Sequence, residues 1–470
     1  AQATSTNASF TVGFFARQAC ALASRQQCNT TSSPRRWACT LARLESVVLP
    51  SCSRMVLRRS QIAQQWLLRT GIVFGAAPVS ENEVHHDVIT DREIYCQGAG
   101  GIDAACDRLV RQFGSELVDA KLLERIEQIT GAAAHPFLKC GLFCAHRSMH
   151  ELLDAYERGE EFYLYTGRGP SASMHLGHLV PFLFTAYLQQ AFNAPCIIQL
   201  TDDEKFLFKG LSFEECQRHL DANVRDIIAC GFDPARTYIF SNFQEIGYLY
   251  PYACQAQRHL TCNQIRATFG IDGSDSPGKM AFPALEMVPA LGSTFADALF
   301  SGKRLRCLVP CGIDQDPYFR LTRDLAQRMG EFKPAVLQSK FLPSLAGTHT
   351  KMSSDNAILL SDLPKMVRKK INKALSGGGA TVEEHRRLGA NLSVDVPLRY
   401  LHCFAGLHGR GAALDLDDVD RQYARGELLS GQVKQMAAEA VSAALQQHLS
   451  AREAVSDHDV ALFMTRRQLL

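Results

Sequence analysis

Two histidines, His175 and His178, stand three positions apart shortly after a glycine-rich segment at residues 166–170. A short apolar run that ends at Tyr165 precedes the glycines, so the pattern predicts a strand, a turn and the start of a helix. The glycines allow the backbone to approach a ligand closely, and the N–H groups at a helix start favour an anion. Because residues three apart lie on one helical face, both imidazoles can donate to a phosphate. The segment therefore predicts a site that stabilises negative charge on a phosphate.

A second segment, Lys351–Ser354, places a lysine beside small hydroxyl residues. A lysine on such a loop is a mobile positive charge suited to a polyphosphate leaving group. A surface lysine alone is commonplace, but the two segments together predict a nucleotide site that is contacted from two sides. A zinc pair is rejected for His175 and His178, since zinc-binding helices usually carry histidines four apart with a glutamate between them.

Short apolar runs separated by helical stretches predict the scaffold between residues 156 and 355. Runs of this kind indicate a parallel sheet that is covered on both faces. The predicted fold class is therefore α/β, with a doubly wound, Rossmann-like catalytic domain whose ligands lie at the carboxyl ends of the strands. The candidate strands are Phe162–Tyr165, Cys196–Leu200, Thr237–Phe240, Cys307–Val309 and Ala335–Leu337.

Residues 1–80 differ in composition from the rest of the chain. They contain nine arginines, no lysine and one acid. That composition suits an organellar transit peptide or a flexible tail. It also suits sequence upstream of the true start, because the first methionine is Met55. These alternatives stay open, and no fold is predicted for this segment.

Two further regions flank the predicted α/β domain. Residues 81–155 form an appended N-terminal region, in which residues 116–127 predict a helix that is capped near Ser115 and stopped by Gly131. After residue 356 the strand signals end. A capping box at Thr381–Glu384 and a later apolar helical face predict a helical domain over residues 356–470.

The composition, 46% apolar and 21% charged, is that of a globular protein. No apolar run reaches the roughly eighteen residues that span a membrane, so no membrane association is predicted. The sixteen cysteines include no CxxC pair. Cys140 and Cys144, like Cys307 and Cys311, lie four apart, whereas zinc sites usually pair cysteines more closely. We therefore expect free buried thiols and no structural metal.

The two motifs match those of the class I aminoacyl-tRNA synthetases. His175–His178 is similar to the HIGH signature, and Lys351–Ser354 is similar to the KMSKS loop. More narrowly, residues 81–465 resemble the eukaryotic-type tryptophanyl-tRNA synthetases. The resemblance implies ATP-dependent ligation of tryptophan to its tRNA through a tryptophanyl-adenylate. Other matching segments are Tyr163–Ser171, Gln199–Lys205, Ile228–Phe232, Gly312–Phe319 and Ser376–Gly378.

The resemblance also implies roles for single residues. His175, His178 and Lys351 would act on the transition state. An indole needs a flat apolar slot with one acceptor, which Gln199 at a strand end can supply. Taken without the resemblance, Asp202–Glu204 indicates a solvated acidic turn. The residues that would bind ATP are Gly167, Arg168, Gly169, Gly177, Lys205, Met352, Ser353 and Ser354, and those that would bind tryptophan are Tyr165, Gln199, Glu204, Glu286, Gln315 and Phe319.

Three positions depart from the family pattern. The smallest change is Gly312, where alanine is usual. Glu286 stands where glutamine is common, and it either pairs with the substrate ammonium or points outward. Asp355 stands at the end of the lysine loop, where its role is open. Three alternatives are a tyrosyl-tRNA synthetase, which shares the fold and motifs, a smaller nucleotidyltransferase, and a catalytically silent paralogue that binds RNA. The intact histidines, Lys351 and Gln199 favour the tryptophan enzyme.

The implied partners are tryptophan, ATP with Mg²⁺ as a substrate complex, and tRNA(Trp). The metal would enter with the phosphates, without a carboxylate cage of the protein. The family habit implies a homodimer formed through a region inserted in the catalytic domain. A cytosolic location is the first choice, and mitochondrial or plastid import is the alternative. A basic cluster of the helical domain suits tRNA phosphates or a solvated face equally; it comprises Lys365, Arg368, Lys369, Lys370, Lys373, Arg386 and Arg387.

Overall fold

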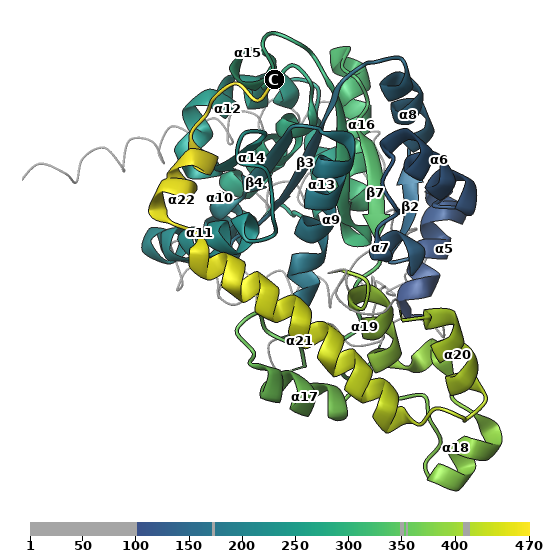
Figure 1. The fold of residues 1–470 in the computed structure, drawn as a ribbon. Coiled ribbons are helices and arrows are strands. Elements are labelled where there is room, and N and C mark those ends of the chain that lie inside the picture. The colour runs from purple at the N-terminus through teal and green to yellow at the C-terminus, as the bar shows by residue number, and fades with distance from the viewer. Residues whose placement is uncertain (1–100, 172–173, 348–351, 354–355, 408–413) are drawn as a thin grey trace, which may run out of the picture. The chain divides into compact units, whose positions relative to one another are not determined.

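The computed structural model describes residues 101–171, 174–347, 352–353, 356–407 and 414–470. The predictions for residues 1–80 and for Lys351, Ser354 and Asp355 lie outside these residues. The described residues all belong to one compact unit (Figure 1). Within them, every helix is too short or too polar to cross a membrane.

A seven-stranded sheet with the order β1-β2-β7-β6-β3-β4-β5 organises the described residues. The strands from β7 to β5 are parallel, and β2 pairs antiparallel with both β7 and β1. Because β3 lies between β4 and β6, the chain leaves the centre of the sheet in both directions, which opens a crevice at the carboxyl ends of the strands. The doubly wound α/β prediction is thus confirmed. The strands are β1 (Glu116–Leu117), β2 (Phe143–Arg147), β3 (Phe162–Arg168), β4 (Cys196–Leu200), β5 (Thr237–Ser241), β6 (Arg306–Gly312) and β7 (Ala335–Ser339).

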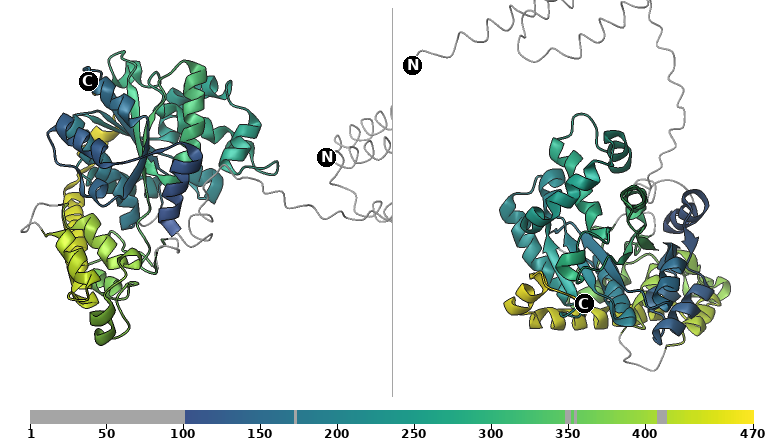
Figure 2. Two further views of the ribbon diagram at one scale, coloured as in Figure 1. Left: turned by 90° about the vertical axis from the view of Figure 1, so that its right-hand side faces the viewer. Right: turned by 90° about the horizontal axis from the view of Figure 1, so that it is seen from above.

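Side chains alternate between two large apolar cores on the two faces of the sheet. Along β3, Phe162 and Leu164 join one core, and Tyr163 and Tyr165 join the other. Successive side chains of a strand point to opposite faces, so a strand that is apolar throughout must be covered twice. Figure 2 shows helices on both sides of the sheet. Up to β7 the helices are α5 (Gly101–Phe113), α6 (Ala120–Thr130), α7 (Pro136–Lys139), α8 (Met149–Glu157), α9 (Leu176–Phe192), α10 (Asp202–Lys209), α11 (Phe213–Ile228), α12 (Asn242–Gln257), α13 (Cys262–Phe269), α14 (Pro277–Met287), α15 (Ala296–Leu299) and α16 (Asp316–Met329), with 3₁₀ turns η1 (Val288–Ala290) and η2 (Ile313–Gln315).

All five candidate strands are present, but the appended region was read incorrectly in two respects. The helix predicted from residue 116 begins at Ala120, where the Asp119 side chain accepts the backbone N–H of Leu122 at 2.8 Å. The residues before it form β1, which pairs with the unpredicted strand β2. Gly131 ends the helix in the left-handed conformation, as expected.

The expectation of free thiols is wrong for one pair. Cys106 on α5 and Cys144 on β2 form a disulfide. They lie 38 residues apart in sequence, so neither the four-residue spacing nor a CxxC pattern could reveal them. The other described cysteines are free, including Cys140, Cys307 and Cys311.

The residues after 356 are helical, as predicted. At α18 the backbone N–H of Glu384 donates to Thr381 Oγ1 at 3.1 Å, although the returning carboxylate accepts from Ala380 and not from Thr381. The long helix α21 buries one face against α17 and α19 and also contacts α11 (Figure 1). The helices are α17 (Pro364–Asn372), α18 (Val382–Leu388), α19 (Val396–Phe404), α20 (Leu416–Ala424), α21 (Ser430–Ala454) and α22 (Asp457–Met464), with η3 (Leu392–Val394).

Candidate active site

A cavity of about 540 Å³ lies at the carboxyl ends of β3, β4 and β6. This volume is within the usual range for pockets that hold small molecules. Its lining contains every predicted site residue that the structure describes, except the exposed Ser353. The predicted residues along the wall are Tyr165, Gly167, Arg168, Gly169, His175, Gly177, His178, Gln199, Glu204, Lys205, Glu286, Gln315, Phe319 and Met352.

Hydrogen bonds orient the amide of Gln199 at one end of the cavity. Its Nε2 donates to Asn242 Oδ1 at 2.7 Å and to the carbonyl of Leu285 at 3.0 Å. Its Oε1 lies 2.5 Å from the hydroxyl of Tyr165. Since both amide hydrogens are used, the oxygen is the part of Gln199 that remains to accept a donor from a ligand. The ring of Phe319 faces Tyr165 edge-on, with centroids 6.3 Å apart, so the acceptor sits beside an aromatic wall.

The acidic turn after β4 is buried, in contrast to the solvated turn that these residues indicate when taken alone. Asp203 Oδ1 accepts from Asn242 Nδ2 at 2.7 Å, and Asp202 accepts from the Ser241 hydroxyl. Burial raises the pKa of Asp203 to about 7. Asn242 therefore connects the acid to Gln199. Asn242 was not among the predicted site residues, although its position after the predicted strand at 237–240 was a usable signal.

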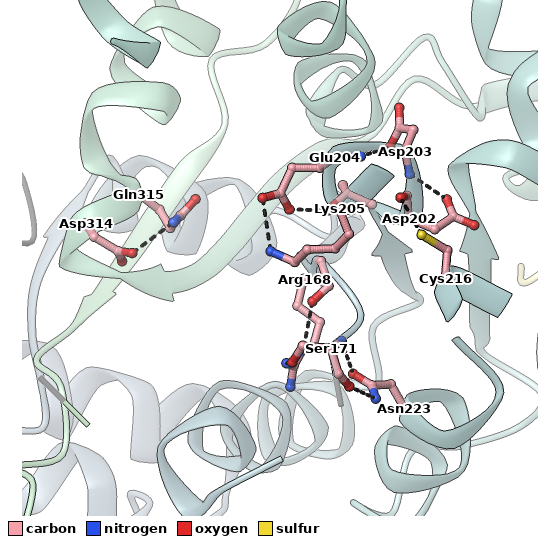
Figure 3. A network of polar contacts seen from close by, with 12 residues as sticks. Arg168, Ser171, Asp202, Asp203, Glu204, Lys205, Cys216, Asn223, Asp314 and Gln315 are labelled. Atoms are coloured by element: carbon pink, nitrogen blue, oxygen red, sulfur yellow. Dashed lines mark hydrogen bonds and ion pairs between the residues drawn. The ribbon is translucent and has the colours of Figure 1, made fainter. Parts of the chain in front are cut away.

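Acidic and amide groups also line the cavity, with Glu204 beside Lys205 and Gln315 beside Asp314 (Figure 3). Glu204 pairs with Lys205 Nζ at 3.0 Å and accepts from the Thr201 hydroxyl at 3.1 Å. Gln315 Nε2 donates to Asp314 Oδ2 at 3.0 Å. Glu286 also lines the cavity, and burial, followed by the charges of Glu204 and Asp203, raises its pKa to about 8. The set concentrates negative charge where a ligand cation would be stabilised.

The glycine-rich turn brings the backbone close to its neighbours. A Cβ at Gly167 would lie 2.6 Å from the carbonyl oxygen of Gln199, and one at Gly169 would overlap the side chains of Glu204 and Lys205. Between them, Arg168 donates to the Ser171 hydroxyl at 2.7 Å (Figure 3). Burial lowers the pKa of Arg168 to about 10, so it keeps its charge at neutral pH. Its second terminal nitrogen is buried without a hydrogen-bond partner among the described residues.

His175 and His178 lie together at the start of α9. Their rings stack with centroids 3.6 Å apart, and the backbone N–H of His175 donates to His178 Nδ1 at 3.4 Å. Burial and the charge of Arg168 lower the pKa of His175 to about 4 and that of His178 to about 2. Both imidazoles are therefore neutral at pH 7. Because Nδ1 of His178 accepts, its proton resides on Nε2, which is a neutral donor.

Met352 of the second motif, and the residues that follow the motif, lie beside His175 and Gly177 at the start of α9. His175 forms an isolated antiparallel bridge with Leu359, and the N–H of Leu176 donates to the carbonyl of Ile358 at 3.0 Å. A Cβ at Gly177 would lie 3.2 Å from both Met352 Sδ and the His175 ring. Lys351 is outside the described residues, but its neighbour Met352 lines the cavity. The two separated motifs thus meet at the start of α9.

Comparison with known proteins identifies the family of this chain. The family model described as "tRNA synthetases class I (W and Y)" matches residues 157–446. The chain belongs to this family of class I tRNA synthetases. The tryptophan--tRNA ligase, cytoplasmic, of Arabidopsis thaliana is 45% identical to this synthetase over 396 residues, which cover 83% of this chain and 96% of the relative.

Solved structures show the same fold. The tryptophanyl-tRNA synthetase from Giardia lamblia is 41% identical with a TM-score of 0.71, and the match covers 79% of this chain and 98% of that one. The tryptophanyl-tRNA synthetase from Encephalitozoon cuniculi bound to tryptophan is 36% identical with a TM-score of 0.70, covering 76% of this chain and 97% of that one. The Rossmann-like class I prediction is confirmed.

The predicted basic cluster of this synthetase contains one residue that is engaged within the protein, Lys370, and six that are exposed. Lys370 donates to Asp362 at 2.5 Å and to the carbonyl of Ala357 at 2.9 Å, so it stabilises the chain after the lysine loop. Burial of Val367 and Ile371 turns the opposite face of α17 outward. The exposed members are Lys365, Arg368, Lys369, Lys373, Arg386 and Arg387.

Proposed function

We propose that this synthetase ligates tryptophan to tRNA(Trp) at the expense of ATP. The observation that carries the proposal is a single cavity in which an oriented amide beside aromatic rings joins a glycine-rich turn and two neutral histidines. The relatives from Arabidopsis and Giardia are named as tryptophan enzymes, which supports the same substrate.

In the proposed complex Phe319 forms part of the pocket wall, and the indole lies with its N–H at Tyr165 and Gln199. Its N–H donates to Gln199 Oε1, whose direction is set by the bonds of Nε2 to Asn242 and Leu285. An acceptor fixed in this way favours a ring N–H, which only donates, over a hydroxyl that must also accept a hydrogen bond. The ammonium would be held by Glu204, Glu286 and Gln315, which line the cavity beside the aromatic end.

The proposed first step forms an adenylate. A carboxylate oxygen of tryptophan attacks the α-phosphorus of ATP, the bond from that phosphorus to the bridging oxygen breaks, and pyrophosphate leaves with Mg²⁺. Such a step needs positioning and charge stabilisation more than covalent help from the protein. The groups proposed to contact the phosphates are Gly167, Arg168, Gly169, Gly177, Lys205, Met352, Ser353 and Ser354, with His175, His178 and Lys351 acting on the charge that develops.

The second step would transfer the tryptophanyl group to a terminal ribose hydroxyl of the tRNA and release AMP. The exposed basic residues of α17 and α18 are proposed to contact tRNA phosphates, which predicts salt-sensitive binding. Lys370 is not part of this surface, because it is engaged with Asp362.

The decisive experiment is ATP–pyrophosphate exchange driven by single amino acids. Exchange with tryptophan, followed by transfer to tRNA(Trp), is the expected result. The second candidate is a tyrosyl-tRNA synthetase, since the matching family includes both specificities. Exchange with tyrosine alone would establish that candidate, and exchange with neither amino acid would favour a silent RNA-binding paralogue.

Assembly and location are further proposals. A homodimer is proposed from the family habit, and sedimentation of the intact chain would test it. A cytosolic location is proposed because the Arabidopsis relative is named cytoplasmic. A reporter fused to residues 1–80 separates this from mitochondrial or plastid import, since a diffuse signal supports the first and an organellar signal supports the second.

A further inference from the structure

Three side chains that could bind a metal ion meet at the edge of the sheet. Glu116 on β1 lies directly opposite His146 on β2, and His150 follows in the first turn of α8. One ligand atom from each residue lies within 4.8 Å of the other two. The rings of His146 and His150 stand edge-on, with centroids 5.1 Å apart. None of the three lines the cavity described above.

His146 gives an independent reason to expect a ligand. Its side chain is only 1% exposed, yet neither ring nitrogen has a hydrogen-bond partner among the described residues. The buried His135 and His385 both make hydrogen bonds. His448 also lacks a hydrogen-bond partner among the described residues, but its Nε2 lies 3.7 Å from a carboxylate oxygen of Asp226. A buried polar group without a partner is costly, so an unpaired imidazole at this position calls for an ion or donor that the described residues do not supply.

The surroundings favour a cation over an anion. The carboxylates of Glu116, Asp119 and Glu151 lie close enough to His146 to act on it electrostatically. Negative charge therefore surrounds an imidazole, which in its neutral form is a common metal ligand. Two imidazoles and one carboxylate are a ligand set that suits Zn²⁺ and leaves one position for water.

We propose that Glu116, His146 and His150 form a Zn²⁺ site that joins β1, β2 and α8. Ligand atoms at about 2.0 Å from a tetrahedral zinc lie roughly 3.3 Å apart, whereas the three atoms here lie within 4.8 Å, so they must close by at most about 1.5 Å. His146 is held by a strand that is paired on both sides, whereas Glu116 is exposed and able to rotate toward it. The cysteine and HxxH patterns gave no sign of this site, because its ligands combine H-x3-H across a strand-to-helix junction with an acid thirty residues earlier.

The test uses the full chain, made without a polyhistidine tag and freed of metal with a chelator that is then removed. Titration calorimetry with Zn²⁺ should show one ion bound per chain, and thermal unfolding should shift upward with added Zn²⁺. Substitution with Co²⁺ should give a visible spectrum of nitrogen and oxygen ligands. A thiolate charge-transfer band would instead assign the ion to cysteines and overturn the proposal.

Glu116→Gln and His150→Gln are the informative variants, because the buried His146 is needed for packing. Each should weaken Zn²⁺ binding by at least tenfold, since even the loss of groups that only support a metal ligand costs about that much. His259→Asn, which removes an exposed histidine elsewhere, should bind Zn²⁺ as the unaltered chain does. Adenylate formation should be unchanged in all three. No stoichiometric ion in the unaltered chain, or unaltered binding in both ligand variants, would refute the site.

Discussion

The amino-acid end and the phosphate end of the cavity are built differently. At the amino-acid end the polar side chains are already tied to one another, as in the chain of hydrogen bonds from Tyr165 through Gln199 and Asn242 to Asp203. At the phosphate end, Arg168 and His175 each keep a buried nitrogen without a hydrogen-bond partner among the described residues. The polar side chains of the amino-acid end therefore have hydrogen-bond partners without a ligand, whereas two buried nitrogens of the phosphate end do not.

This difference suggests that the amino-acid end serves tryptophan recognition and the phosphate end serves catalysis. A preformed acceptor selects an indole at little cost in ordering, because its orientation is fixed before binding. A buried nitrogen without a partner can form a hydrogen bond to a phosphate as negative charge develops on it. The resulting stabilisation appears mainly in the transition state. Changes at the phosphate end should therefore reduce the rate, and changes at the amino-acid end should reduce the affinity for tryptophan.

His178→Ala should have the largest effect. Removing one preorganised donor to a developing negative charge typically lowers the rate about 10²- to 10³-fold. We expect this loss in the turnover number of tryptophan-dependent pyrophosphate exchange. Tryptophan affinity, measured by equilibrium dialysis, should stay within about twofold because His178 lies at the other end of the cavity.

The pH profile provides a second check on His178. With pKa values lowered to about 4 for His175 and about 2 for His178, both imidazoles are neutral throughout pH 6–8. The rate of the unaltered enzyme should therefore show no loss attributable to histidine as the pH falls through 6.5. An inflection there that disappears in His178→Ala would mean that the charged form acts, and unaltered exchange in the variant would remove His178 from the mechanism.

Asn242→Ala should have an intermediate effect of the opposite kind. Losing the Asn242 acceptor frees one hydrogen of the Gln199 amide, so the amide can turn and present nitrogen to the indole. A hydrogen bond of this type contributes about 0.5–1.5 kcal/mol, which predicts a KM for tryptophan up to about tenfold higher with little change in the turnover number. Asn223→Ala is the matched control, since that amide contacts Ser171 and lies outside the tryptophan end. A fall in turnover without a change in KM would contradict the role of Asn242.

Some parts of this site were predictable from the sequence, and others were not. Gln199, Gly167 and Gly312 lie at the carboxyl ends of strands. These strands were predictable because buried parallel strands have continuous apolar runs, and the carboxyl ends of such strands must meet. Asn242 was not predicted, because its importance lies in two hydrogen bonds to residues about forty positions away. β1 and β2 were missed for a similar reason. β1 spans only two residues, and β2 is short and is paired with a strand almost two hundred positions later.

Glu286→Gln should have the smallest effect, and one that depends on pH. Burial raises the pKa of Glu286 to about 8, so this carboxyl is mostly protonated at pH 6.5 and charged above pH 8. A bound ammonium would favour the charged form, so tryptophan affinity in the unaltered enzyme should rise with pH up to about 8 relative to the glutamine variant. The expected gain is about 3- to 10-fold, because a pKa change of up to about one unit corresponds to a factor of at most ten. Measuring both proteins by equilibrium dialysis at each pH from 6.5 to 8.5 cancels the titration of tryptophan itself. A ratio that stays constant with pH would mean that Glu286 points away from the ammonium, and the amino-acid end would then owe its ammonium affinity to Glu204 and Gln315.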